Sequence, residues 1–169
     1  MQSESTRMCT AEEAAFRVQY PNSQTRRSLV IVLDEENRHI LDEAADLPWN
    51  GARFFSFKAT EPLSEALDSI ILDAILESAD GSTSRLTEEV ATADVVVMIT
   101  SAGQSAEAAA AIGNICFVRN VMTTGLILSE RHEGDDASLT LRNLRPYAAM
   151  LVVASGNDYI PAMLAALRA

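Results

Sequence analysis

The residues that could do chemistry gather in one short stretch, residues 100–105, which reads TSAGQS. Its hydroxyl groups can donate hydrogen bonds, and Gly103 lets the backbone approach a ligand closely. An apolar run at 95–99 precedes it, and an alanine-rich segment that predicts a helix follows it. Because the first amides of a helix lack partners and attract negative charge, this pattern predicts an anion site. The expected contacts are Thr100, Ser101, Gly103, Gln104 and Ser105. The alternative is that Ser101 or Ser105 only caps the helix.

Three more polar residues follow other predicted strands. Ligands of open parallel sheets bind beyond the carboxyl ends of the strands, where the winding order reverses. Ser129 and Ser155 follow the fourth and fifth predicted strands, and we expect them to add ligand contacts. Lys58, the only lysine of the chain, follows the second. A compact cation there suits a phosphate, although an ordinary surface position is the alternative.

The acidic clusters favour solvated surface over a metal centre. Residues 34–36, DEE, would suit a divalent cation after a first strand, as in phosphate-accepting receiver domains. Such a site needs an aspartate after the third strand, where this chain has Thr100 and Ser101, so an acidic helix start is the simpler interpretation. Residues 132–136, HEGDD, match no helical or hairpin ligand spacing. His39 is expected at the surface. No metal site is predicted.

Nucleophilic and cofactor motifs give no further candidate. Cys116 falls on the helix face of Ala109 and Ile112 and is expected in the core. Ser105 and Ser155 have no base identifiable by spacing, and the glycine-x-serine-x-glycine elbow is absent from the sequence. Neither a dinucleotide fingerprint nor a phosphate-loop lysine occurs. Enzymatic activity and the identity of any cofactor are left open.

Alternating strands and helices are needed to position these residues. The predicted strands are residues 29–33, 52–57, 95–99, 121–128 and 150–154. The predicted helices are residues 10–18, 35–47, 63–79, 85–93, 105–118, 139–144 and 158–167. This order predicts an α/β fold, a Rossmann-like three-layer αβα sandwich around a mostly parallel five-stranded sheet. We expect an N-terminal helix and linker at 1–27 and a single α/β domain at 28–169.

Charge and composition limit the partners. The 169 residues carry a net charge of -11, with 24 acidic against 13 basic side chains, so nucleic acid and acidic membranes are poor partners. Two cysteines and an N-terminal stretch without a signal-peptide pattern predict a reducing cytoplasmic location. The apolar runs are much shorter than the roughly 20 residues that cross a bilayer.

Residues 94–107, DVVVMITSAGQSAE, resemble the strand, loop and helix of the sugar isomerase (SIS) domain. That pattern is an aspartate, an apolar strand, a loop with Ser-Gly-x-Thr or Ser, and an acidic residue two places later. Thr100, Gly103, Ser105 and Glu107 fall on it, while Ala102 stands where the family has a serine. The resemblance covers residues 94–128. It implies phosphosugar binding, with Glu107 or a histidine as proton shuttle and Lys58 as an electrostatic aid.

Two functions from different classes follow. The first is binding of a small phosphorylated or carboxylated metabolite at residues 100–105, in a phosphosugar isomerase or regulator. The second is a non-catalytic interaction or regulatory module whose acidic surface meets a basic protein. The small residues at 106 and 108–111 would also allow close packing in a symmetric homodimer.

Overall fold

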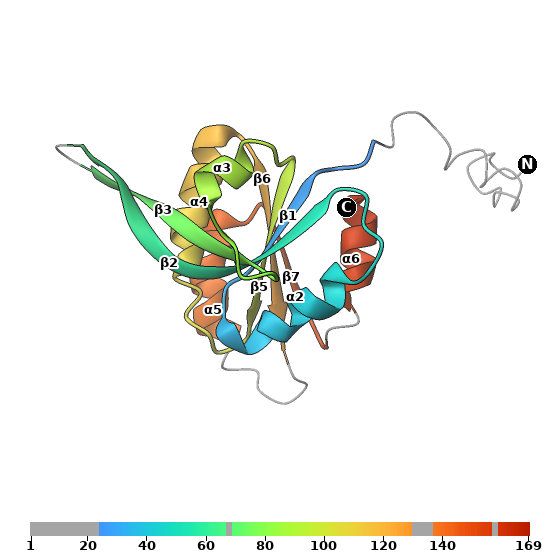
Figure 1. The fold of residues 1–169 in the computed structure, drawn as a ribbon. Helices are drawn as coiled ribbons and strands as arrows, with labels where there is room; N and C mark the ends of the chain where they lie inside the picture. Colours follow the sequence, from blue (N-terminus) through green and yellow to red (C-terminus); the bar gives the residue numbers. More distant parts are fainter. Residues whose placement is uncertain (1–23, 67–68, 130–136, 157–158) are drawn as a thin grey trace, which may run out of the picture.

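The computed structural model describes residues 24–66, 69–129, 137–156 and 159–169, with the backbone alone at 62–66 and 69–71. It is an α/β fold around one seven-stranded sheet of order β4-β3-β2-β1-β5-β6-β7 (Figure 1). The strands are β1 (Ser28–Val32), β2 (Ala52–Ala66), β3 (Ser69–Ser78), β4 (Thr83–Arg85), β5 (Val95–Ser101), β6 (Met122–Leu128) and β7 (Met150–Ala154). The predicted helix at 10–18 lies outside the described residues.

The sheet is mixed, which corrects the prediction of five mostly parallel strands. β2, β1, β5, β6 and β7 pair in parallel, as expected for strands joined by helical crossovers. β3 and β4 are additional, and both pair antiparallel. β1 and β5 are buried on both faces, because their runs SLVIV and VVVMITS are almost entirely apolar.

The prediction of a helix at 63–79 is wrong, because this segment holds the end of β2 and all of β3. Its apolar residues fit a helical period, but residues 70–76, IILDAIL, are also a short and nearly continuous apolar run, which is compatible with a buried strand, and isoleucine favours strands. Pro62, expected in a first helical turn, lies instead at a register shift between β2 and β3. A proline is tolerated at such an irregularity because no regular ladder bond is lost. The β2–β3 ribbon extends past the helices in Figure 1.

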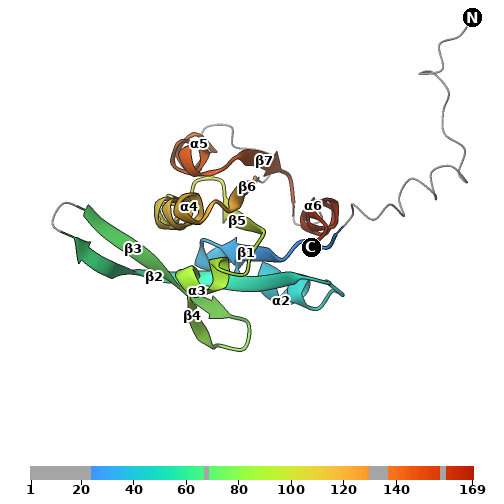
Figure 2. The ribbon, with the colours of Figure 1, turned by 90° about the horizontal axis from the view of Figure 1, so that it is seen from above.

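Helices cover both faces of the sheet (Figure 2). α2 (Arg38–Ala45) and α6 (Tyr159–Leu167) pack on one face around Val30, Val97 and Leu126. α3 (Leu86–Val90), α4 (Ala108–Arg119) and α5 (Ala137–Leu144) pack on the other, around residues such as Leu76 and Met98. Short 3-10 turns, η2 (Glu35–Asn37) and η3 (Arg145–Tyr147), join strands and helices. The αβα layering is therefore confirmed.

Two further observations bear on the predicted partners. In the part of the chain that the structure describes, no helix has both the length and the apolarity needed to cross a membrane. The alanines 108, 109 and 111 of α4 are buried within the chain's own core. This small-residue face is therefore used against the sheet and is not free for a second copy.

Candidate functional site

The chain's winding reverses between β1 and β5. From β1 the chain continues through α2 to β2 on one side, and β5 lies on the other side of β1. Connections that diverge in this way leave a crevice at the carboxyl ends of the two strands. A pocket of about 190 Å³ lies there. Its lining residues are Leu33, Asp34, Phe57, Thr100, Gln104, Ser105, Ala106, Glu107 and Ala108.

Thr100 is the most informative of the lining residues. It lies near the end of β5 and is fully buried, and its Oγ1 has no hydrogen-bond partner within the described residues. A buried hydroxyl without a partner costs about 1 to 3 kcal/mol, so folded proteins rarely retain one. Thr100 therefore offers a hydrogen bond that the chain itself does not use.

The loop after β5 turns sharply and is fixed by hydrogen bonds from residues that are distant in the sequence. Gln104 N donates to Ser101 O at 3.3 Å, and Gly103 adopts φ 91°, which closes a four-residue turn that needs glycine. Thr140 of α5 ties the turn down: its Oγ1 accepts from Gly103 N at 3.1 Å and donates to Gln104 O at 2.7 Å. Asn143 Nδ2 donates to Ser105 O. The turn is thus fixed by side chains from α5.

The backbone amides of the next four residues, 105–108, differ from those of Gly103 and Gln104 in their hydrogen bonding. The described part of the chain supplies no hydrogen-bond acceptor for them, whereas Ala109 N and Ala110 N already donate to Ala106 O and Glu107 O. Ala106 has φ 50°, a left-handed conformation that costs a non-glycine residue about 1 kcal/mol. The helix consequently begins at Ala108 and not at Ser105 as predicted. The residues that carry these amides, the strained Ala106 among them, all line the pocket.

Asp34, a lining residue of the pocket, connects the segment after β1 with the end of β5. Its Oδ1 accepts from Asn37 N at 3.0 Å and caps η2, and its Oδ2 accepts from Ser101 N at 2.9 Å. Asn37 Nδ2 in turn donates to Ser101 Oγ at 2.6 Å. Outside this network, Gln104 Nε2 donates to Glu36 Oε2 at 3.1 Å. Each carboxylate oxygen of Asp34 therefore accepts one backbone N–H. One of these bonds caps η2, and the other links the residue to the end of β5.

The pocket brings together some of the residues predicted from sequence and leaves others apart. Thr100, Gln104, Ser105 and Glu107 line it. Ser101 and Gly103 shape the loop without lining the pocket. The other two predicted ligand contacts, Ser129 and Ser155, also follow the carboxyl ends of strands but do not line the pocket. Ser129 N donates to Ala154 O at 2.8 Å, and Ser155 lines an open groove beside α6.

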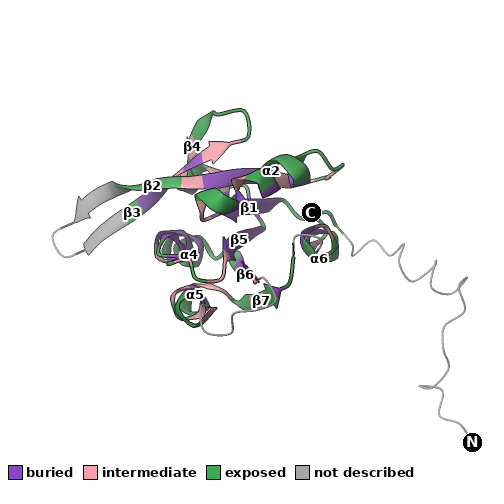
Figure 3. Ribbon diagram, turned by 90° about the horizontal axis from the view of Figure 1, so that it is seen from below, coloured by how far each residue is buried: buried purple, intermediate pink, exposed green. Residues whose placement is uncertain are grey.

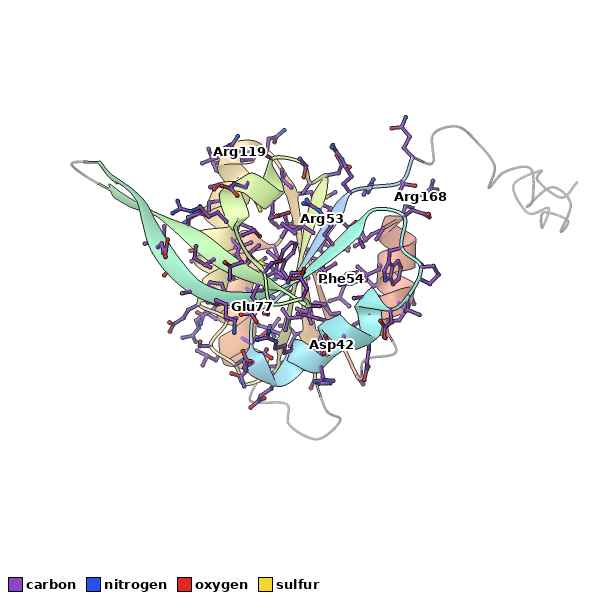
Figure 4. The ribbon with its side chains drawn as sticks, in the orientation of Figure 1. Asp42, Arg53, Phe54, Glu77, Arg119 and Arg168 are labelled. Atoms are coloured by element: carbon purple, nitrogen blue, oxygen red, sulfur yellow. The ribbon has the colours of Figure 1, made fainter. Side chains whose placement is uncertain are left out.

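Lys58 does not line the pocket, although the neighbouring Phe57 does. β2 continues to Ala66, so Lys58 lies inside the strand and not at its end. Its Nζ is 2.8 Å from Glu77 Oε2, and Arg38 of α2 contacts the same carboxylate (Figure 4 labels Glu77). The hydrogen bonds from Lys58 and Arg38 lower the pKa of Glu77 below its usual value. This cluster joins β2, β3 and α2.

Two other titratable groups have structural settings. Cys116 is fully buried in α4, as predicted, and burial raises the pKa of its thiol to about 12. His39 is exposed, and its Nδ1 is 2.9 Å from Glu36 O. The HEGDD cluster at 132–136 lies outside the described residues.

Several residues of the site were missed from sequence. Phe57 forms an apolar part of the wall, Asn37 of η2 donates to Ser101, and Thr140 and Asn143 of α5 hold the loop. Asp34 was predicted as part of an acidic helix start and does cap η2, but its bond from Ser101 N was not predicted. Asn37, Thr140 and Asn143 bond to residues 36 or more positions away, and no local spacing identifies such pairs.

A comparison with models of known protein families finds no match to this chain. A comparison with curated protein sequences finds none either.

Proposed function

We propose that this protein binds a small phosphorylated or carboxylated metabolite in the pocket between β1 and β5. The observation that carries the proposal is the fully buried Thr100 hydroxyl, which has no partner among the described residues; four residues of the same pocket, 105–108, have backbone amides that also lack one there. Convergent N–H and O–H donors at the start of a twelve-residue helix suit an anion. The volume, about 190 Å³, is below the roughly 300 Å³ where drug-sized sites begin, so the ligand is small.

The two carboxylates of the wall narrow the ligand class. Asp34 and Glu107 would repel a bare anion, but a carboxylate also accepts hydrogen bonds from hydroxyl groups. Asp34 already accepts two backbone N–H groups, whereas Glu107 is exposed and makes no side-chain cap bond to its helix. A ligand with an anionic end at the amides and a hydroxyl near Glu107 satisfies both sets. Sugar phosphates and hydroxy acids have that composition.

The resemblance of residues 94–128 to the SIS domain supports the same ligand class. Thr100, Ser105 and Glu107, which carry that resemblance, are also lining residues of the pocket. If the bound metabolite is isomerised, Glu107 is the group we assign to move the proton, because it is exposed and makes no cap bond, whereas each oxygen of Asp34 already accepts a backbone N–H. The cytoplasmic location stays a prediction from the sequence.

The test is Thr100→Val, which removes the hydroxyl and keeps the shape. Because that hydroxyl is unpaired, the free energy of unfolding without ligand should stay equal or rise by about 1 kcal/mol. Titration calorimetry and thermal shift with inorganic phosphate, hexose phosphates and citrate should show binding to the wild type. The variant should bind at least about tenfold more weakly, as expected for a lost hydrogen bond to a charged group.

Thr123→Val is the matched control. Thr123 lies at the other end of the neighbouring strand β6, is buried, and its Oγ1 donates to Tyr147 O at 2.6 Å. The control should lose about 1 kcal/mol of stability and keep its affinity for the ligand. Absence of binding by every probe to the wild type, or equal affinity in Thr100→Val, would overturn the proposal.

A further inference from the structure

The two edges of the sheet are built differently (Figure 2). At one edge, β4 is three residues long and polar, and its Arg85 pairs with Glu61 of β2 at 3.5 Å. Short, charged strands of this kind protect an edge from pairing with another chain. At the other edge, β7 has five residues, MLVVA, with neither charge nor proline. Its outer backbone row has no strand partner among the described residues.

The surface around β7 is apolar and partly open (Figure 3). Met150 is 42% exposed and Val153 51% exposed, and Tyr159 at the start of α6 is 42% exposed. An open groove of about 380 Å³ runs beside the strand, lined by Val152, Val153, Ala154, Ser155, Tyr159 and Ala162. An exposed apolar edge strand is a template for an added strand.

The distribution of charge on the chain indicates which kind of strand can pair with β7. The chain as a whole carries a net charge of -11, yet residues 148–156 contain no charged side chain. A basic partner drawn to the acidic surface would find no carboxylate within residues 148–156. An uncharged apolar strand fits it, and the same strand of a second copy has that composition. Two acidic copies also repel each other least where they meet through uncharged segments.

We propose that β7 pairs with β7 of a second copy of this chain, antiparallel about a two-fold axis, to form one sheet across a homodimer. An axis passing at Val152 sets Leu151 opposite the second copy's Val153, so apolar side chains meet on both faces of the joined sheet. Such a contact is isologous and closes on itself, which limits assembly to two copies. It places the interface on β7 and leaves the small residues of α4 in the core.

The test is the mass of the full chain by sedimentation at several concentrations, with Val153→Lys as the variant. A lysine at this exposed position adds a charge to the edge without filling the core. The wild type should sediment at twice the monomer mass at high concentration. The variant should dissociate, with a dissociation constant raised by roughly a hundredfold, because two-fold symmetry brings two lysines to one interface.

Phe117→Lys is the matched control. Phe117 is the most exposed large apolar residue among those described, at 87%, and belongs to the last turn of α4, not to β7 or its groove. This variant should dimerise as the wild type does. A wild type that stays monomeric overturns the proposal, as does a dimer that Val153→Lys leaves intact or that Phe117→Lys abolishes. Circular dichroism of both variants confirms that each is folded.

Discussion

At the scale of single residues, the site is distinguished by which polar groups are used and which are not. Ser101, Gly103 and Thr140 have their hydrogen bonds inside the chain, and they build the loop. Thr100 has the same kind of side chain as Thr140 but no hydrogen-bond partner among the described residues. The sequence predicted ligand contacts for all the hydroxyls of this loop alike. It could not separate Ser101, which accepts from Asn37, from Thr100, because that difference depends on a residue 64 positions earlier in the chain.

The charge cluster around Glu77 makes stability depend on pH. Lys58 and Arg38 lower the folded-state pKa of Glu77, so its contribution to stability is complete above its ordinary pKa of 4.5 and is lost as the pH falls through the lowered value. The difference in unfolding free energy between wild type and Glu77→Gln should therefore be constant near neutrality and narrow in acid. Urea unfolding at several pH values measures this.

Glu43→Gln is the control for this prediction. It removes a carboxylate charge, as Glu77→Gln does, but it leaves the ion pairs of Glu77 in place. Glu43 lies on the exposed face of α2, without an ion pair among the described residues. A wild-type advantage over Glu77→Gln that stays the same from neutral pH into acid would contradict the assignment of the pH dependence to this cluster.

At the scale of elements, the strongest local patterns predicted their structures well. β1, β5, β6 and β7 are within a few residues of their predicted bounds, because continuous apolar runs bordered by polar residues permit little else. Residues 63–79 were mispredicted because the nearly continuous apolar run at 70–76 is compatible with a buried strand as well as with a helix. Pairing of β3 with β2 on one side and β4 on the other decides between them, and neither partner is visible in the segment itself.

The carboxyl end of α4 gives a test of helix termination. Asn120 adopts φ 55°, and Val121 N donates to Cys116 O at 2.9 Å, the bond that closes a left-handed helix end. Asn120→Ala should therefore lower the unfolding free energy by about 1 kcal/mol, since alanine resists this conformation. Asn120→Gly should equal or exceed the wild type. Chemical unfolding measures both.

Asn114→Ala is the control for this prediction, since Asn114 is exposed in the interior of the same helix. There alanine is the better helix former, so the same substitution should leave stability unchanged or raise it slightly. If Asn120→Ala were as stable as Asn114→Ala, the left-handed ending would contribute nothing to stability.

At the scale of the whole molecule, the strand order decides where a ligand and a partner can bind. The central pair, β1 and β5, is buried between both helical layers, and its reversal of winding creates the crevice. The outer strands differ in protection, and only β7 combines length with an uncharged surface. The proposed small-molecule site and the proposed dimer edge are therefore separate features of one sheet.

The sheet should also show a gradient of local stability. Backbone amides of β1 and β5 should exchange with solvent only through global unfolding, whereas those of β4, a short edge strand with two exposed residues and one half-buried residue, should exchange much faster. Hydrogen–deuterium exchange with peptide-level mass spectrometry measures both. Equal exchange in β1 and β4 would be inconsistent with this burial pattern.

By itself, the sequence determined the α/β class, four of the parallel strands, most helix positions and the loop at residues 100–105. Those features arise from local periodicity and from glycine and hydroxyl chemistry, which neighbouring residues carry. Only the tertiary structure decided the strand order, the β2–β3 hairpin, the holding of the loop by Asp34 and Thr140, and the unpaired state of Thr100. The physical reason is that each of these depends on contacts between residues distant in the chain. The energy of such a contact depends on both segments together and cannot be inferred from the local sequence of one.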